Sequence, residues 1–157
     1  MSAGHVMYYF AGREHIVAET LLYAEEELAG RRDRRVRTAA DPTAALSVLV
    51  RMYLPSGRSD ARWRLWAQLL ARAPADAATR DKVAGVIDGW TASLSAVIEA
   101  GCATGEMTCP DPRRTAYDVC RLMDGYALEV MLGRRGATRA WAVAAVEQFC
   151  LRLVAPR

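Results

Sequence analysis

A set of aromatic side chains, with one methionine, falls on the middle helices expected for this 157-residue sequence. A hollow between helices that is lined by such side chains is a common type of small-molecule site. Tryptophan rings would also suit a cation, which is attracted to the face of an indole. Each of these residues taken singly is better explained as core filling, and only the set suggests a site. The candidate ligand pocket comprises Met52, Tyr53, Trp63, Trp66, Trp90, Tyr117 and Asp124.

Asp124 is the charged member of this set. It lies beside Gly125, in a segment that is otherwise mostly apolar. Its carboxylate could orient a polar ligand, whereas the Asp124-Gly125 pair could equally serve the packing of one helix on another. Packing is the simpler of the two explanations.

The residues that usually carry out catalysis are scarce. The sequence has no Ser/His/Asp spacing, no paired catalytic carboxylates and no glycine-rich phosphate loop. Only two histidines, His5 and His15, could exchange protons near neutral pH. None of the four cysteines forms a Cys-x-x-Cys pair, and Cys120 and Cys150 fall on apolar faces where buried thiols are common. We therefore expect no enzyme, no metal site and no cofactor.

Composition and charge are those of an ordinary soluble globular protein. About half of the residues are apolar (52%), a quarter are charged and the net charge is +3. This mild charge does not by itself indicate a nucleic-acid partner. We find no secretory signal and no apolar run long enough to span a bilayer. We therefore expect a cytoplasmic protein with no membrane partner.

A run of arginines between residues 31 and 37 is the densest charge cluster. Cations are favoured at the C-terminus of a helix by the helix dipole, so a solvated helix end followed by a loop explains the run. A phosphate contact is the alternative, and the solvated helix end is favoured over it.

The elements that would position these residues are helices. Apolar residues recur at helical spacing, and no segment alternates as a strand would. Asp41-Pro42 and Asp111-Pro112 are typical helix starts, and Gly105 and Gly133 follow expected helix ends. We predict an all-α fold of about seven helices, over residues 2–10, 13–29, 42–54, 60–73, 77–103, 112–132 and 139–153.

Three of these helices have faces that bear on the assembly. In the helix over residues 13–29 an apolar stripe faces inward, and Glu19, Glu25, Glu26 and Glu27 occupy much of the other side. The last two helices are apolar on more than one side, so each needs more than one neighbour. A partner subunit or the core of a monomer could supply the additional neighbour.

The N-terminal residues carry a family resemblance. Tyr8-Tyr9-Phe10-x-Gly12-Arg13-Glu14-x-Ile16 resembles the end of the DNA-binding domain of TetR-family transcriptional regulators, where a recognition helix is followed by a connecting helix. Further elements resemble the C-terminal domain of the subgroup of betaine/choline-pathway repressors. They are Trp63 with Trp66, Trp90, Gly101-x-x-x-Gly105, Asp111-Pro112 and Leu122-Met123-Asp124-Gly125.

The resemblance implies a domain organisation and a homodimer. Residues 1–12 would end the DNA-binding domain, 13–30 would form the connecting helix, and 31–157 would bind ligand and dimerise. The last two helices of each subunit would build a TetR-like four-helix bundle across a two-fold axis. The implied interface residues are Val119, Met123, Ala127, Val130, Trp141, Ala145 and Phe149.

The resemblance also implies a function. By position, Ser2, Gly4, His5, Tyr8, Tyr9 and Arg13 would contact DNA. In the family two helices precede the segment that begins at Ser2, whereas only Met1 precedes it here, so we expect operator binding only if those helices are present. The expected function is a ligand-responsive DNA-binding regulator, a repressor with an unknown hydrophobic or cationic effector. A dimeric small-molecule-binding module without DNA binding is the alternative.

Overall fold

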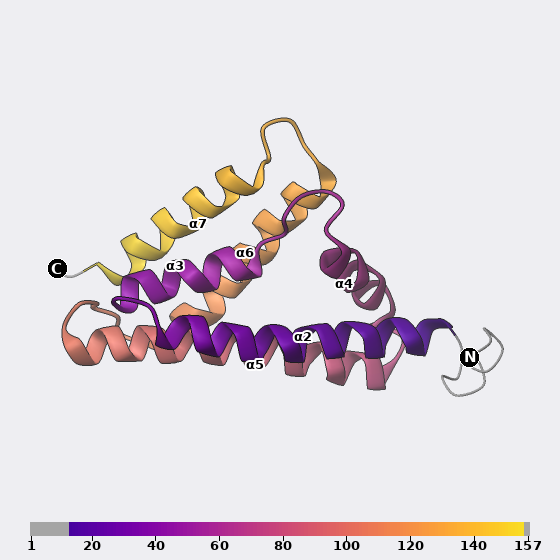
Figure 1. The fold of residues 1–157 in the computed structure, drawn as a ribbon, viewed down its shortest axis with the longest axis horizontal. Helices are drawn as coiled ribbons and strands as arrows, with labels where there is room; N and C mark the ends of the chain where they lie inside the picture. The colour runs from indigo at the N-terminus through magenta and orange to yellow at the C-terminus, as the bar shows by residue number, and fades with distance from the viewer. Residues whose placement is uncertain (1–12, 156–157) are drawn as a thin grey trace.

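The computed structural model describes residues 13–155, which form six helices (Figure 1). The helices are α2 (Arg13–Arg37), α3 (Pro42–Tyr53), α4 (Ala61–Arg72), α5 (Ala77–Thr104), α6 (Pro112–Leu132) and α7 (Arg139–Val154). The all-α prediction is confirmed for the described residues. The short helix predicted at residues 2–10 lies outside them. So do the proposed DNA contacts Ser2, Gly4, His5, Tyr8 and Tyr9, together with the side chain of Arg13.

Short polar side chains start the helices where the sequence predicted them. The Asp41 carboxylate accepts a hydrogen bond from the Ala44 amide at 2.7 Å, and Asp111 accepts one from the Arg114 amide at 2.9 Å. Asp60, Asp76 and Thr138 cap α4, α5 and α7 in the same way. These bonds satisfy amides that have no partner inside the helix, which fixes the start of each helix.

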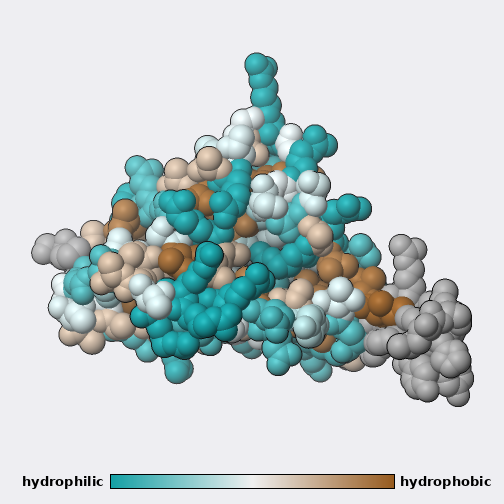
Figure 2. Space-filling view, in the orientation of Figure 1, coloured by the Kyte–Doolittle hydropathy of each residue, from teal (hydrophilic) through white to brown (hydrophobic). Residues whose placement is uncertain are grey.

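α2 is longer than the helix predicted over residues 13–29. It passes through Gly30, where the prediction ended it, and continues to Arg37. A glycine inside a helix costs about 1 kcal/mol relative to alanine, which tertiary packing can offset. Arg32 and Val36, both beyond Gly30, pack against the rest of the chain. The arginine run is therefore helical. Figure 2 shows a hydrophilic surface over this half of α2, where Arg31, Arg34 and Arg35 are exposed.

The helices are arranged around two long ones. α2 and α5 lie side by side along the long axis of the molecule, and α3, α6 and α7 lie on one side of them (Figure 1). α4 contacts the N-terminal half of the α2–α5 pair.

Two groups of buried side chains hold this arrangement together. The larger group joins α3, α6 and α7 to the C-terminal half of α5, with Leu49, Leu94 and Ile98 fully buried. The smaller group joins α2, α4 and the N-terminal half of α5 through Leu21, Trp66 and neighbouring residues.

α5 corrects one expectation from the sequence. By length and composition this helix is apolar enough to cross a membrane, although we expected no such run. In this structure α5 packs against α2, α3, α4 and α6. The core helix of a soluble protein meets the same criterion, and 33% of the apolar window of α5 is buried inside the fold.

The structure also corrects the assignment of the apolar stripe on α6. Val119, Met123, Ala127 and Val130 were expected in the dimer interface, but they are at most 2% exposed within a single chain. α6 contacts both α5 and α7, so its most apolar side is used inside the subunit. The side of α6 that remains open carries Leu128 and Leu132 instead, at 57% and 60% exposure.

On α7 the remaining predicted interface residues are only partly covered. Trp141 is exposed, and Ala145 and Phe149 are half-buried. The Trp141 ring packs against Tyr126 of α6 with centroids 4.9 Å apart, which joins the outer surfaces of the two helices.

Candidate ligand-binding site

A cavity of about 300 Å³ lies between the end of α3 and helices α4, α5 and α6. Its walls are mainly aromatic and aliphatic. The lining residues are Tyr53, Arg62, Trp63, Trp66, Ala67, Leu70, Val86, Ile87, Trp90, Asp124, Leu128 and Met131.

The cavity brings together five of the seven predicted pocket residues, namely Tyr53, Trp63, Trp66, Trp90 and Asp124. Met52 and Tyr117 do not line it. Met52 lies in a separate groove between α2, α3 and α7, and Tyr117 is exposed on α6 near the guanidinium groups of Arg114 and Arg121.

Seven lining residues were not predicted. Leu128 and Met131 follow Asp124 at spacings of four and seven, so their helical register could have placed them beside it. Arg62 and the aliphatic residues of α4 and α5 carry no local pattern that separates cavity from core.

Aromatic rings meet at right angles on one side of the cavity. The Tyr53 ring stands edge-on to Trp90, with centroids 5.0 Å apart and an interplanar angle of 84°. It also stands edge-on to Trp63, at 5.7 Å and 71°. Such edge-to-face contacts between buried rings favour one arrangement over others. The aromatic side of the cavity is therefore formed before any ligand arrives.

The cavity has one carboxylate in its wall. Asp124 accepts a hydrogen bond from the Tyr53 hydroxyl, and its other oxygen lies 3.2 Å from Nη2 of Arg121. Burial raises the pKa of Asp124 above its ordinary value, while the Tyr53 hydroxyl and Arg121 act in the opposite direction. Burial, followed by the charge of Asp124, raises the pKa of Tyr53, so the hydroxyl remains a donor.

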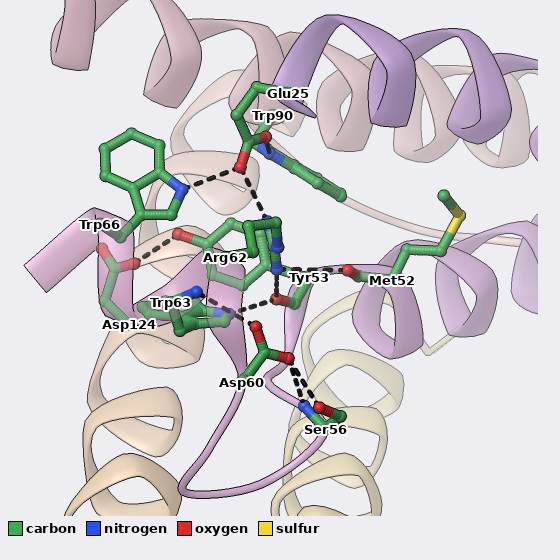
Figure 3. Close-up of polar contacts among 10 residues, drawn as sticks. All are labelled: Glu25, Met52, Tyr53, Ser56, Asp60, Arg62, Trp63, Trp66, Trp90 and Asp124. Carbon is green, nitrogen blue, oxygen red and sulfur yellow. Dashed lines mark hydrogen bonds and ion pairs between the residues drawn. The ribbon is translucent and has the colours of Figure 1, made fainter. Parts of the chain in front are cut away.

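A second carboxylate lies behind the wall, on α2. Glu25 is buried and accepts hydrogen bonds from three lining residues, as Figure 3 shows. Nε1 of Trp66 is 2.8 Å from Oε1, and Nη1 of Arg62 is 3.0 Å from the same oxygen. Nε1 of Trp90 is 3.2 Å from Oε2. The sequence had suggested that Glu25 faces solvent, and that expectation is wrong.

The α3–α4 connection is held by polar contacts from α4. Arg62 and Trp63 both donate to the carbonyl oxygen of Tyr53, the latter from Nε1 at 3.0 Å (Figure 3). Asp60 accepts from the amide and hydroxyl of Ser56, each at 2.8 Å. These bonds satisfy the last carbonyl of α3 and fix Tyr53 and Trp63 in the cavity wall.

The geometry suits binding better than catalysis. The wall offers apolar area, indole faces, one carboxylate and the guanidinium of Arg62, and the polar groups are held by contacts within the protein. Among the described side chains, residues 16–155, no group of His, Cys, Asp and Glu is arranged to hold a metal ion.

Comparisons with known proteins agree with this architecture. Residues 42–155 match the family of the BetI-type transcriptional repressor, C-terminal region. No curated protein matches the chain. Among solved structures, a protein described as a transcriptional regulator from Saccharomonospora viridis, in complex with choline, superposes with a TM-score of 0.89 at 22% identity. That match covers 100% of this chain and 82% of the other.

Two further structures show the same fold. A TetR transcription regulator from Haloarcula marismortui has a TM-score of 0.82 at 21% identity, covering 98% of this chain and 81% of its own. The regulator FadR from Bacillus subtilis, in complex with stearoyl-CoA, has a TM-score of 0.77 at 16% identity, covering 96% and 81%.

The fold is all-helical and TetR-like. Because the family match covers most of the sequence, the chain belongs to the TetR family, with a C-terminal region of the BetI type. These relatives are regulators rather than enzymes.

Proposed function

We propose that this chain senses a small cationic effector and that it is the ligand-responsive part of a transcriptional repressor. The observation that supports this most is the Asp124 carboxylate in a wall that is mainly aromatic and aliphatic. Arg62, the cationic side chain among the described residues of that wall, is paired with Glu25 at 3.0 Å, so its charge is already offset within the protein. A cation is attracted to the faces of aromatic rings, and more strongly where water is excluded. The negative charge of Asp124 adds a direct electrostatic attraction.

The size of the cavity favours a small molecule. About 300 Å³ is at the lower end of the range for small-molecule sites. Choline and stearoyl-CoA, the ligands bound in two of the related structures, differ greatly in size. We take choline as the first compound to test because it combines small size with a permanent positive charge.

A titration by calorimetry tests this proposal. Choline should bind, and its neutral isostere 3,3-dimethylbutan-1-ol should bind at least about tenfold more weakly, because it lacks the charge that the rings and Asp124 would attract. Equal binding of the two compounds would contradict a cation site, and binding of the alcohol alone would favour a hydrophobic effector.

We propose a homodimer formed through the open sides of α6 and α7. Leu132 and Trp141 are large, apolar and exposed there, as interface residues are before association. Half-buried Ala145 and Phe149 would lie in the same interface.

Light scattering tests this interface. Leu132→Arg and Trp141→Arg should each shift the mass at micromolar concentration from dimer to monomer. Tyr23→Arg is the matched control, because Tyr23 is a similarly exposed apolar residue on α2, outside the proposed interface. A monomeric wild-type protein would refute the dimer.

Operator binding completes the proposed function. α2 would connect the sensing helices to a DNA-binding head, and effector binding would favour one orientation of α2 over another. A regulator of this kind acts in the cytoplasm, where the DNA is. A gel shift with a protein that carries a complete helix-turn-helix should show operator release when choline is added.

A further inference from the structure

α2 takes no part in the lining of the cavity, yet its Glu25 binds three of the lining side chains. The Glu25 side chain is only 5% exposed, so its hydrogen bonds are shielded from bulk water. Trp66 and Arg62 belong to α4, and Trp90 belongs to α5. One side chain of α2 therefore connects the α4 wall of the cavity to the α5 wall.

The chemistry of the contact requires a carboxylate. Two indole N–H groups and a guanidinium all donate, and a carboxylate accepts at both oxygens without offering a proton. A glutamine in the same position would have one acceptor oxygen and would turn an N–H₂ group towards at least one of these donors. Glu25 is therefore not replaceable by its neutral analogue.

Trp90 is held by α2 at a second point. The guanidinium carbon of Arg32, two helical turns after Glu25, lies 4.5 Å from the centre of the Trp90 ring. The edge of this indole is fixed by Glu25 and its face by Arg32, while the same ring lines the cavity. A displacement of Trp90 must therefore move α2 or break these contacts.

We propose that Glu25 is a positioning residue that sets the Trp66 and Trp90 rings and transmits occupancy of the cavity to α2. This inference rests on the proposed function for the identity of the ligand. A ligand that packs against either ring would act on α2 through these hydrogen bonds, and would thereby favour one of the orientations of α2 that the proposed function requires. The apolar contacts of Ala18 and Leu21 with the same wall are non-directional, so they do not fix the rings in this way.

The first experiment measures the four indole N–H signals in a ¹⁵N spectrum, which the four tryptophans of the chain make simple to assign by single Trp→Phe variants. In the wild type, the Trp66 and Trp90 N–H protons should exchange with solvent much more slowly than that of exposed Trp141. Glu25→Gln should shift and expose the Trp66 and Trp90 signals. It should leave Trp63, whose N–H is bonded to the Tyr53 carbonyl, unchanged.

The second experiment measures hydrogen exchange of the α2 amides with and without saturating choline. In the wild type, choline should change exchange over α2 by about fivefold or more, the lower end of ordinary coupling between sites. Glu25→Gln should bind choline more weakly and, once saturated at its own higher choline concentration, should lose this change. Glu27→Gln is the matched control, because it makes the same substitution at an exposed position of α2 and should behave as the wild type.

The outcomes separate this inference from the proposed function. If choline binds but α2 exchange does not change in the wild type, or changes equally in Glu25→Gln, the coupling role of Glu25 is refuted and the ligand site stands. If choline does not bind at all, the proposed ligand and the coupling fail together. In that case the solvent exchange of the wild-type indole N–H protons still tests the positioning role of Glu25. The same measurement serves if Glu25→Gln does not fold. Rapid exchange of both Trp66 and Trp90 would refute the positioning role.

Discussion

Replacing Asp124 with asparagine should weaken the binding of choline. The substitution removes the negative charge but keeps an oxygen that can accept the Tyr53 hydroxyl bond. At a separation of about 5 Å and an effective dielectric constant of about 20, two unit charges interact by about 3 kcal/mol. Asp124 is 40% exposed and Arg121 already lies 3.2 Å away, so screening should reduce this value. We expect a loss of about 1.4 kcal/mol, which is about tenfold in affinity.

Isothermal titration calorimetry with choline measures this loss. Asp118→Asn is the matched control, because Asp118 lies on the same helix in an exposed pair with Arg114 and should leave the affinity unchanged. If Asp124→Asn binds choline as tightly as the wild type, Asp124 is not the counter-charge of the ligand.

The affinity for choline measured in this titration should increase with pH. Burial raises the folded-state pKa of Asp124 above the ordinary carboxyl value of 3.8, so the folded protein holds this proton more tightly than the unfolded chain does. Asp124 therefore costs stability as the pH rises from 3.8 through the raised pKa. Choline carries a charge that does not titrate, so its affinity should rise over the same window as Asp124 ionises. Asp124→Asn should abolish this rise, and a pH-independent wild-type affinity would contradict it.

Two further predictions concern stability and are measured by chemical denaturation. Tyr53→Phe removes the hydroxyl that donates to the half-buried Asp124 carboxylate, and should cost about 1–2 kcal/mol of unfolding free energy; an unchanged midpoint would show that water replaces the bond. Gly101→Ala should destabilise by about 1–3 kcal/mol because its Cβ would lie 2.6 Å from Sδ of buried Met107. Gly85→Ala, on the same helix with open space around it, should stabilise by up to about 1 kcal/mol; the opposite order of the two glycine variants would contradict the packing described for α5.

Local patterns in the sequence were sufficient for the helices and for several of their ends. The caps at Asp41 and Asp111 involve residues only three positions apart, so a sequence motif contains the whole interaction. The end of α2 was missed because Gly30 is a local signal. The packing of Arg32 and Val36 against residues distant in the sequence stabilises the continuation of α2 beyond Gly30.

The site was also predictable only in part, because several of its contacts join residues that are far apart in the sequence. Clustering of aromatic residues identified Tyr53 and the three tryptophans that line the cavity. Glu25 was assigned to solvent because two further glutamates, Glu26 and Glu27, follow it, whereas its partners lie 37 to 65 positions away. The apolar stripe of α6 was recognised, but periodicity does not say which neighbour covers a stripe. Here the neighbour belongs to the same chain.

The claim that the aromatic cavity binds a small cation is tested most directly by nuclear Overhauser contacts from the N-methyl protons of bound choline. We predict contacts to ring protons of Trp66 and Trp90 and to the side chains of Leu128 and Met131, which line the same cavity. Contacts only to residues of the groove that contains Met52, or a saturating titration with no contact to any of the three cavity tryptophans, would contradict the claim.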